Sequence, residues 1–214
     1  MIAASAVKLL APILPSKIIG IGKNYADHAA EMKSELPAEP LMFLKPSTAV
    51  IGPGEVITLP NQSSMVHHEA ELAVVIGRFC KDVPRDRVSE VILGFTCAND
   101  VSARDVQESD VQWSRAKGFD TFCPLGPWIE TDLDPSDLAV TAYVGDDLRQ
   151  SGNTKNMFFS AVDLVSFVSH QMTLLPGDVI LTGTPAGVGP IVSGDEVEVA
   201  IEGIGSLVNT VQRA

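Results

Sequence analysis

Short apolar segments bounded by glycine or proline recur along this sequence, and only one segment has the length and pattern of a full helix. The expected strands cover residues 17–22, 41–44, 55–59, 65–77, 93–99, 140–144, 148–150, 179–182, 196–201 and 207–211. The expected helices cover residues 25–33, 85–91, 102–108 and 160–174. A Rossmann fold requires strands and helices to alternate, and this pattern does not. The sequence therefore predicts an α+β fold that is mostly β.

The helix expected over 160–174 is the clearest local prediction. Its apolar side chains fall on one face, at Ala161, Leu164, Val165, Val168 and Met172. Pro176 and Gly177 follow it and end it. We interpret this stripe as part of the core. Asn24 and Ser102 are expected to cap the two short helices that follow them.

Length and charge limit the domain organisation and the partners. The 214 residues suffice for one domain, 1–214, in which residues 1–16 lead into the first strand. A net charge of -12 argues against nucleic acid as a partner, because phosphate binding requires clustered lysine and arginine. It also means that an anionic substrate needs a local positive centre. We expect no membrane span, because no apolar run is long enough.

The three cysteines, Cys80, Cys97 and Cys123, lie far apart and form no CxxC pair. This spacing argues against a disulfide framework and against a zinc site. We expect each of them to be a small buried side chain. A reducing, cytoplasmic setting is the expectation that follows.

Acidic side chains on two neighbouring expected strands indicate a metal site. Glu69 and Glu71 lie two apart in a strand segment and should share a face, and Asp100 follows the next strand. Three carboxylates form a hard, all-oxygen ligand set, which suits Mg²⁺ or Mn²⁺ better than zinc. The adjacent His67 and His68 should point to opposite faces and cannot both reach one metal. The alternative is a solvent-facing strand edge with two charged residues.

Four further positions bear side chains that suit catalysis. His28 and Glu31 lie three apart in the helix expected over 25–33 and can hydrogen-bond, and a carboxylate beside an imidazole favours a general base. Thr184 follows a buried strand and can offer its hydroxyl to a carboxylate. The alternatives are an ordinary surface pair at 28 and 31, a surface lysine at Lys117 and a simple turn at 183–185.

Six motifs, in order, resemble the fumarylacetoacetate hydrolase family. They are GKNYADH, EPLMFLKPSTAVIGPG, HHEAELAVVIG, AND with SARDVQ, RAKGFDTFCPLGPW and PGDVILTGTPAGVGP. The similarity extends from about residue 17 to 211 and is strongest to the short members that act on acylpyruvates and oxaloacetate. It implies a β-rich roll with short helices, a divalent metal, Mg²⁺ or Mn²⁺, and a homodimer.

The resemblance also implies roles for individual residues. It implies that Glu69, Glu71 and Asp100 are the metal ligands, and that His28 and Glu31 form a catalytic dyad on a helix closing over the site. It implies that Lys117 is a positive catalytic contact near the reacting centre. The positions that it implies for the substrate pocket are Arg104, Gln107 and Thr184.

These roles predict metal-dependent cleavage of a carbon–carbon bond in a small 2-oxo acid. The predicted reaction is acylpyruvate hydrolysis, a hydrolase activity. Oxaloacetate decarboxylation, a lyase activity, is predicted as a linked reaction of the same site. In both, the electrons left on C3 delocalise into the keto oxygen as pyruvate enolate, whose charge a metal stabilises. The alternatives are an isomerase–decarboxylase of unsaturated dicarboxylates in aromatic catabolism and a non-catalytic sensor of 2-oxo acids.

Overall fold

The computed structural model describes residues 7–31 and 37–214 and consists mainly of strands with a few short helices. The strands are β1 (Ile18–Gly22), β2 (Leu41–Lys45), β3 (Val50–Ile51), β4 (Val56–Leu59), β5 (Val66–His68), β6 (Ala70–Ile76), β7 (Ile92–Asn99), β8 (Ser102–Ala103), β9 (Cys123–Glu130), β10 (Ala139–Val144), β11 (Asp147–Asn153), β12 (Val179–Leu181), β13 (Gly189–Pro190), β14 (Glu196–Ile201) and β15 (Gly205–Arg213). The helices are α1 (Ala26–Glu31), α2 (Arg104–Ser109), α3 (Ser114–Lys117) and α4 (Ala161–Gln171), with 3₁₀ turns η2 (Ser47–Ala49), η3 (Arg85–Glu90) and η4 (Thr154–Asn156). The predicted mostly-β class is confirmed.

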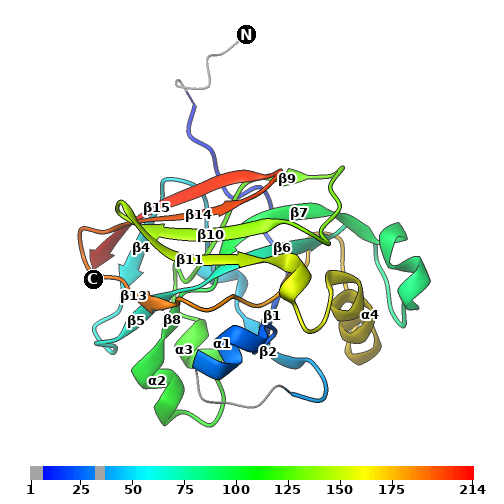
Figure 1. Cartoon of the computed structure of the whole chain (residues 1–214), viewed down its shortest axis with the longest axis horizontal. Coiled ribbons are helices and arrows are strands. Elements are labelled where there is room, and N and C mark those ends of the chain that lie inside the picture. Colours follow the sequence, from blue (N-terminus) through cyan, green and yellow to red (C-terminus); the bar gives the residue numbers. More distant parts are fainter. Residues whose placement is uncertain (1–6, 32–36) are drawn as a thin grey trace.

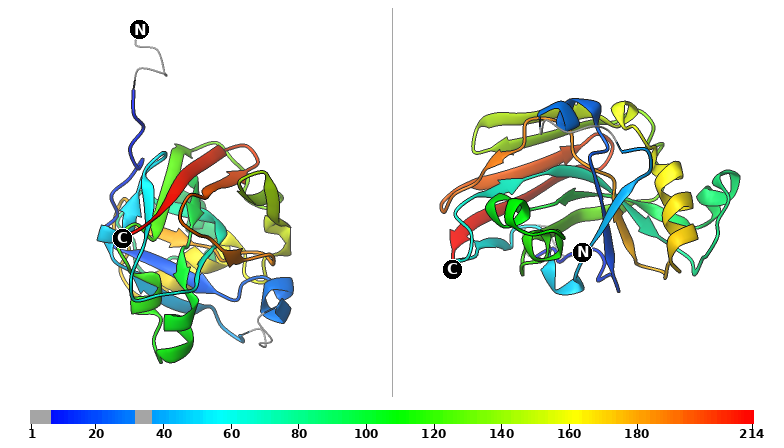
Figure 2. Two further views of the ribbon diagram at one scale, coloured as in Figure 1. Left: turned by 90° about the vertical axis from the view of Figure 1, so that its left-hand side faces the viewer. Right: turned by 90° about the horizontal axis from the view of Figure 1, so that it is seen from below.

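The described residues form three sheets, which together make up the roll. The largest has seven strands in the order β2-β1-β12-β6-β7-β9-β3, the second has five in the order β11-β10-β14-β15-β4, and β13-β5-β8 form the third. Figure 1 shows the second sheet lying over β6 and β7. Figure 2 shows that the large sheets are strongly curved. Helices α1, α2 and α3 gather on the side away from the second sheet, below the strands in Figure 1.

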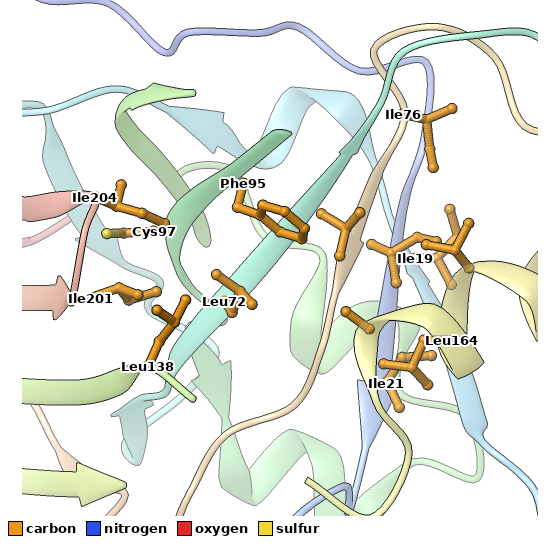
Figure 3. Packing of buried hydrophobic residues seen from close by; sticks show 14 of the residues in the cluster. Ile19, Ile21, Leu72, Ile76, Phe95, Cys97, Leu138, Leu164, Ile201 and Ile204 are labelled. Atoms are coloured by element: carbon orange, nitrogen blue, oxygen red, sulfur yellow. The ribbon is translucent and has the colours of Figure 1, made fainter. Parts of the chain in front are cut away.

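The main core lies between the two large sheets and is closed at one end by α4. Figure 3 shows Leu72 of β6, with Phe95 and Cys97 of β7, near Ile201. The same cluster includes Leu164 of α4 near Ile19 and Ile21. The α4 stripe is thus core, as predicted. The Ser160 hydroxyl caps this helix in a capping box with Asp163.

Alternation along β6 separates this core from the opposite face. Ala70, Leu72 and Val74 belong to the main core, whereas Ala73 and Val75 belong to a second cluster on the other face of the sheet. Successive strand side chains point to opposite faces, so Glu71 shares the face of Ala73 and Val75. Glu71 therefore points away from the main core, to the side on which Arg104 and Gln107 of α2 and Lys117 of α3 lie.

Several local predictions need correction. Residues 85–90 form a 3₁₀ turn. Residues Ser102–Ala103 form β8, and the Ser102 hydroxyl donates to the Asp100 carbonyl instead of capping α2. The Asn24 side chain binds the backbone of Phe159 and Thr182 instead of capping α1. Of the helix expected over 25–33, residues 32 and 33 lie outside the described residues.

The three cysteines are free and buried, as predicted. Among the described residues, no helix is both long enough and apolar enough to cross a membrane.

Candidate active site

The start of β6 and the end of β7 bring the three predicted metal ligands together. The two strands pair in antiparallel register with Ala70 opposite Asn99, so the residues before and after them are neighbours. The Asp100 amide donates to the Glu69 carbonyl at 2.9 Å. Glu69 itself lies in the break between β5 and β6, not within one continuous strand. Carboxylate oxygens of Glu69, Glu71 and Asp100 nevertheless lie within 4.8 Å of one another, and all three residues are buried.

Cationic side chains compensate two of these carboxylates. Glu69 accepts from the Arg104 guanidinium, and from Lys117 Nζ at 2.7 Å. Asp100 accepts from Lys117 Nζ at 2.6 Å and from Lys45 Nζ at 2.5 Å. Burial alone would raise the pKa of Glu69, but the positive charges of Arg104 and Lys117 hold this pKa well below its usual range.

Glu71 is in a different position. Its carboxylate accepts a 2.7 Å hydrogen bond from the Gly183 amide, because β12 pairs with β6 and brings residue 183 beside it. None of the described lysines or arginines forms an ion pair with it within 4.0 Å. Burial and the negative charges of Asp100 and Glu69 raise the pKa of Glu71 well above its usual range.

This donor set fits a divalent cation. The ligand atoms are carboxylate oxygens, which Mg²⁺ and Mn²⁺ prefer, and the buried Glu71 carboxylate is short of positive charge. A cation held by Glu69, Glu71 and Asp100 would supply that charge. Neither His67 nor His68 is among the described residues that line the cavity beside these carboxylates, and His68 Nδ1 lies 3.0 Å from Gln150 Oε1. Burial and the Arg104 charge lower the pKa of His67 to about 4.

The predicted dyad is formed at α1. His28 Nδ1 lies 3.0 Å from Glu31 Oε2, and the other Glu31 oxygen accepts from the Gly187 amide at 3.1 Å. The imidazole is buried and lines the same cavity as the three carboxylates. Because Glu31 engages Nδ1, Nε2 is the nitrogen left to exchange a proton with a ligand.

The cavity has a volume of about 60 Å³ and contains eight of the nine residues that the sequence singled out. Its lining residues are Ile21, Gly22, Lys23, His28, Phe43, Glu69, Glu71, Asp100, Arg104, Gln107, Trp113, Lys117 and Thr184. Glu31, the ninth, joins through His28. The geometry thus brings the predicted residues together, and their individual roles stay predictions.

Hydrogen bonds within the protein engage the predicted substrate-binding residues. Arg104 Nη1 donates to Gln107 Oε1 at 2.8 Å, and Arg104 Nε is buried without a partner among the described residues. The Thr184 hydroxyl donates to the Ala70 carbonyl at 2.8 Å and accepts from Gln150 Nε2 at 2.7 Å. Thr184 therefore has no hydroxyl proton to spare for a ligand.

Several residues around the cavity carry no signal in the sequence. Lys45 is 1% exposed and binds Asp100. Phe43 lies on the same face of β2, with Lys117 Nζ 5.0 Å from its ring centroid, and its ring meets Trp113 edge-on at 5.6 Å. The alternation in Leu41–Lys45 would have placed Phe43 and Lys45 on one face, but nothing local shows that this face is buried.

Comparison with known proteins places this geometry in a family. Residues 17–212 match the model of the fumarylacetoacetate (FAA) hydrolase C-terminal domain. Human mitochondrial oxaloacetate tautomerase FAHD2A is 44% identical over 97% of this chain and 70% of its own length. The structure of 5-carboxymethyl-2-hydroxymuconate delta-isomerase from Mycobacterium smegmatis is 59% identical, covers 99% of this chain and 84% of its own, and superposes with a TM-score of 0.93.

A third relative carries a metal. The structure of maleylpyruvate hydrolase from Sphingobium sp. SYK-6, in complex with manganese(II) and pyruvate, is 37% identical and superposes with a TM-score of 0.87. It covers 100% of this chain and 76% of its own length. The match over nearly all of the sequence, the shared fold and the acidic cluster agree, and this chain belongs to the fumarylacetoacetate hydrolase family.

Proposed function

We propose that this chain is a divalent-metal-dependent enzyme that cleaves a carbon–carbon bond in small 2-oxo acids. The preferred reaction is acylpyruvate hydrolysis, with oxaloacetate decarboxylation as a linked activity. The observation that carries the proposal is the meeting of three buried carboxylates and the His28–Glu31 dyad at one cavity. When bound by Glu69, Glu71 and Asp100, Mg²⁺ or Mn²⁺ would supply a Lewis acid for the carboxylate and keto oxygens of the substrate.

The residues of the chain then perform the proton transfers. His28 Nε2 removes a proton from water as the water oxygen bonds to C4, and Glu31 holds the imidazole through Nδ1. The C3–C4 bond breaks, and its electron pair stays on C3 and delocalises into the C2 keto oxygen. Lys117, which lines the cavity, adds positive charge near that oxygen. The proton that His28 took from water is delivered to C3, which completes pyruvate, and the acyl group, now bearing the water oxygen, leaves as a carboxylic acid.

Proton transfer without bond cleavage is the second candidate. The 44% identical relative is an oxaloacetate tautomerase, and a 59% identical one carries the name of an isomerase. Both reactions move a proton at carbon, for which a buried histidine positioned by a carboxylate suffices. This candidate uses the same cavity and the same dyad but needs no attacking water.

A substrate panel separates the candidates. Acetylpyruvate, fumarylpyruvate and oxaloacetate should be assayed with Mg²⁺, with Mn²⁺ and with a chelator, recording pyruvate formation and enol absorbance separately. His28→Ala should lower acylpyruvate hydrolysis by about a hundred- to ten-thousand-fold and spare oxaloacetate decarboxylation, which needs no nucleophile. Enol conversion without pyruvate would favour the tautomerase. No turnover of any substrate with either metal would leave only a binding function.

A homodimer is proposed as the working assembly. Large apolar side chains stay exposed on the single chain, among them Trp128, Leu148 and Phe158, and association would cover such surface. Light scattering at micromolar concentration tests the proposal, and a stable monomer would contradict it.

A further inference from the structure

The cations around the cavity differ in whether they already have an anionic partner. Lys117 and Arg104 both line the cavity, and both form ion pairs with Glu69. Lys23 lines the same cavity and is half-buried. Among residues 7–31 and 37–214, no carboxylate lies within 4.0 Å of its ammonium group. Lys23 is therefore the cavity cation that is left for a ligand.

The backbone at Lys23 is unusual for a residue with a side chain. Its φ is 58°, in the left-handed region that glycine adopts without cost and that other residues disfavour. A lysine in such a conformation at the wall of a cavity is the kind of strain that accompanies function.

The neighbours on either side hold Lys23 in place. A Cβ on Gly22 would lie 2.7 Å from the Trp113 ring, so this ring packs directly on the Gly22 backbone. On the other side, the Asn24 amide donates to the carbonyls of Phe159 and Thr182 at 2.9 and 2.7 Å. A long flexible side chain thus starts from a fixed point at the end of β1, beside the end of β12.

We propose that Lys23 binds the distal carboxylate of a dicarboxylic 2-oxo acid, and so selects diacids over 2-oxo acids with a neutral tail. This inference rests on the proposed function, because the 2-oxo acid end of the substrate must lie at the carboxylate cluster. A second carboxylate brought into a chain with a net charge of -12 needs a cation of its own. The aromatic rings of Phe43 and Trp113 give the rest of that subsite an apolar wall.

The test measures selectivity. Lys23→Met removes the charge and keeps most of the length, Lys23→Arg keeps the charge, and Lys155→Met removes one charge from an exposed position outside the cavity. The ratio of kcat/KM for fumarylpyruvate to kcat/KM for acetylpyruvate should fall about tenfold or more in Lys23→Met, as the loss of a hydrogen bond to a charged group predicts. The ratio should be retained in Lys23→Arg and unchanged in Lys155→Met.

A binding measurement makes the result independent of turnover. Calorimetry with Mg²⁺ present compares 2-oxoglutarate with 2-oxopentanoate, which lacks the distal carboxylate. Wild type should bind the diacid more tightly, and Lys23→Met should lose that difference. Lys23→Gly guards against misfolding, because it relieves the left-handed strain and should unfold no earlier than wild type while losing the same selectivity.

The outcomes separate the two proposals. Cleavage of both substrates with no selectivity in wild type, or equal losses for both in Lys23→Met, would overturn the role of Lys23 and leave the proposed function standing. If no substrate is turned over but the diacid is bound more tightly in a way that depends on Lys23, the proposed function is overturned and the role of Lys23 stands. Absence of both turnover and binding would overturn both.

Discussion

The three clustered carboxylates should differ sharply when each is neutralised. Glu69 binds Arg104 and Lys117, whereas the one hydrogen bond that Glu71 accepts from a described residue comes from the Gly183 amide. In the metal-free protein, Glu69→Gln leaves two buried cations without that partner. Glu71→Gln keeps an acceptor for Gly183 and removes a carboxylate that two others repel. The two substitutions are chemically identical, so any difference in stability reports the charge arrangement.

The structure sets the magnitudes. Breaking a buried ion pair from one side costs about 3–5 kcal/mol, which is the expected loss for Glu69→Gln. The other two carboxylates lie no more than 4.8 Å from that of Glu71, and two like charges at this separation repel by about 3.5 kcal/mol at an effective dielectric constant of about 20. Glu71→Gln should therefore leave the metal-free stability unchanged where Glu71 is protonated, and raise it by about 3 kcal/mol or more where Glu71 is ionised. Because the pKa of Glu71 is raised in the folded protein, wild type loses stability as pH rises above the usual glutamate pKa. The stability gained by Glu71→Gln relative to wild type should therefore grow with pH.

Urea unfolding with chelator and with metal measures both effects. Wild type should gain about 2.7 kcal/mol when the free metal is at 100 times its Kd, and both variants should lose this gain. If Glu71→Gln is as unstable as Glu69→Gln in chelator, the charge arrangement described here is wrong. If Glu71→Gln keeps the full gain from Mg²⁺ or Mn²⁺, its assignment as a ligand is wrong.

Three further changes test other parts of the structure. Lys45→Met removes a buried partner of Asp100 and should lower the metal-free stability by about 3–5 kcal/mol in urea titrations; an unchanged midpoint would refute the buried pair. Burial opposes ionisation of Asp105, but hydrogen bonds from Ser63, Ser64 and Val106 lower its pKa to about 2. The lowered pKa means that ionised Asp105 stabilises the folded protein above the usual aspartate pKa, and this contribution is lost as pH falls from about 4 to 2. The free energy of unfolding of Asp105→Asn should therefore depend less on pH in the acid range than that of wild type. A Cβ on Gly20 would lie 2.1 Å from the Phe43 ring, so Gly20→Ala should displace that ring, cost about 1–3 kcal/mol in thermal unfolding and lower kcat/KM; normal values for both would contradict this packing.

Local patterns predicted most of the strands and the long helix. The α4 stripe and the β10–β11 hairpin follow from spacing and turn residues alone. β9 was missed because Pro124, Gly126 and Pro127 are typical of a loop. Its place in the sheet depends on pairing with β7 and β3, which no local pattern encodes.

The site was predicted in part for the same reason. Glu69, Glu71 and Asp100 stand next to recognisable strands, so the chain order placed them near one another. Lys45 ends one apolar segment and Lys23 follows another, and in sequence neither can be distinguished from a surface lysine. Asp100, 55 positions away, determines the burial of Lys45, and Trp113 packs beside Lys23 through Gly22. Such partners become visible only in three dimensions.

The parallel pairing of β1 with β12 has a consequence for how the chain acquires its fold. Ile18 lies opposite Val179, so a strand from the beginning of the chain is completed by one near its end. Closing so long a loop has a high entropic cost, and topologies rich in such contacts fold slowly. During synthesis, the sheet cannot close until residues 179–181 have left the ribosome. Thr184, which lines the cavity, follows directly, so the cavity cannot be complete before β12 has joined the sheet.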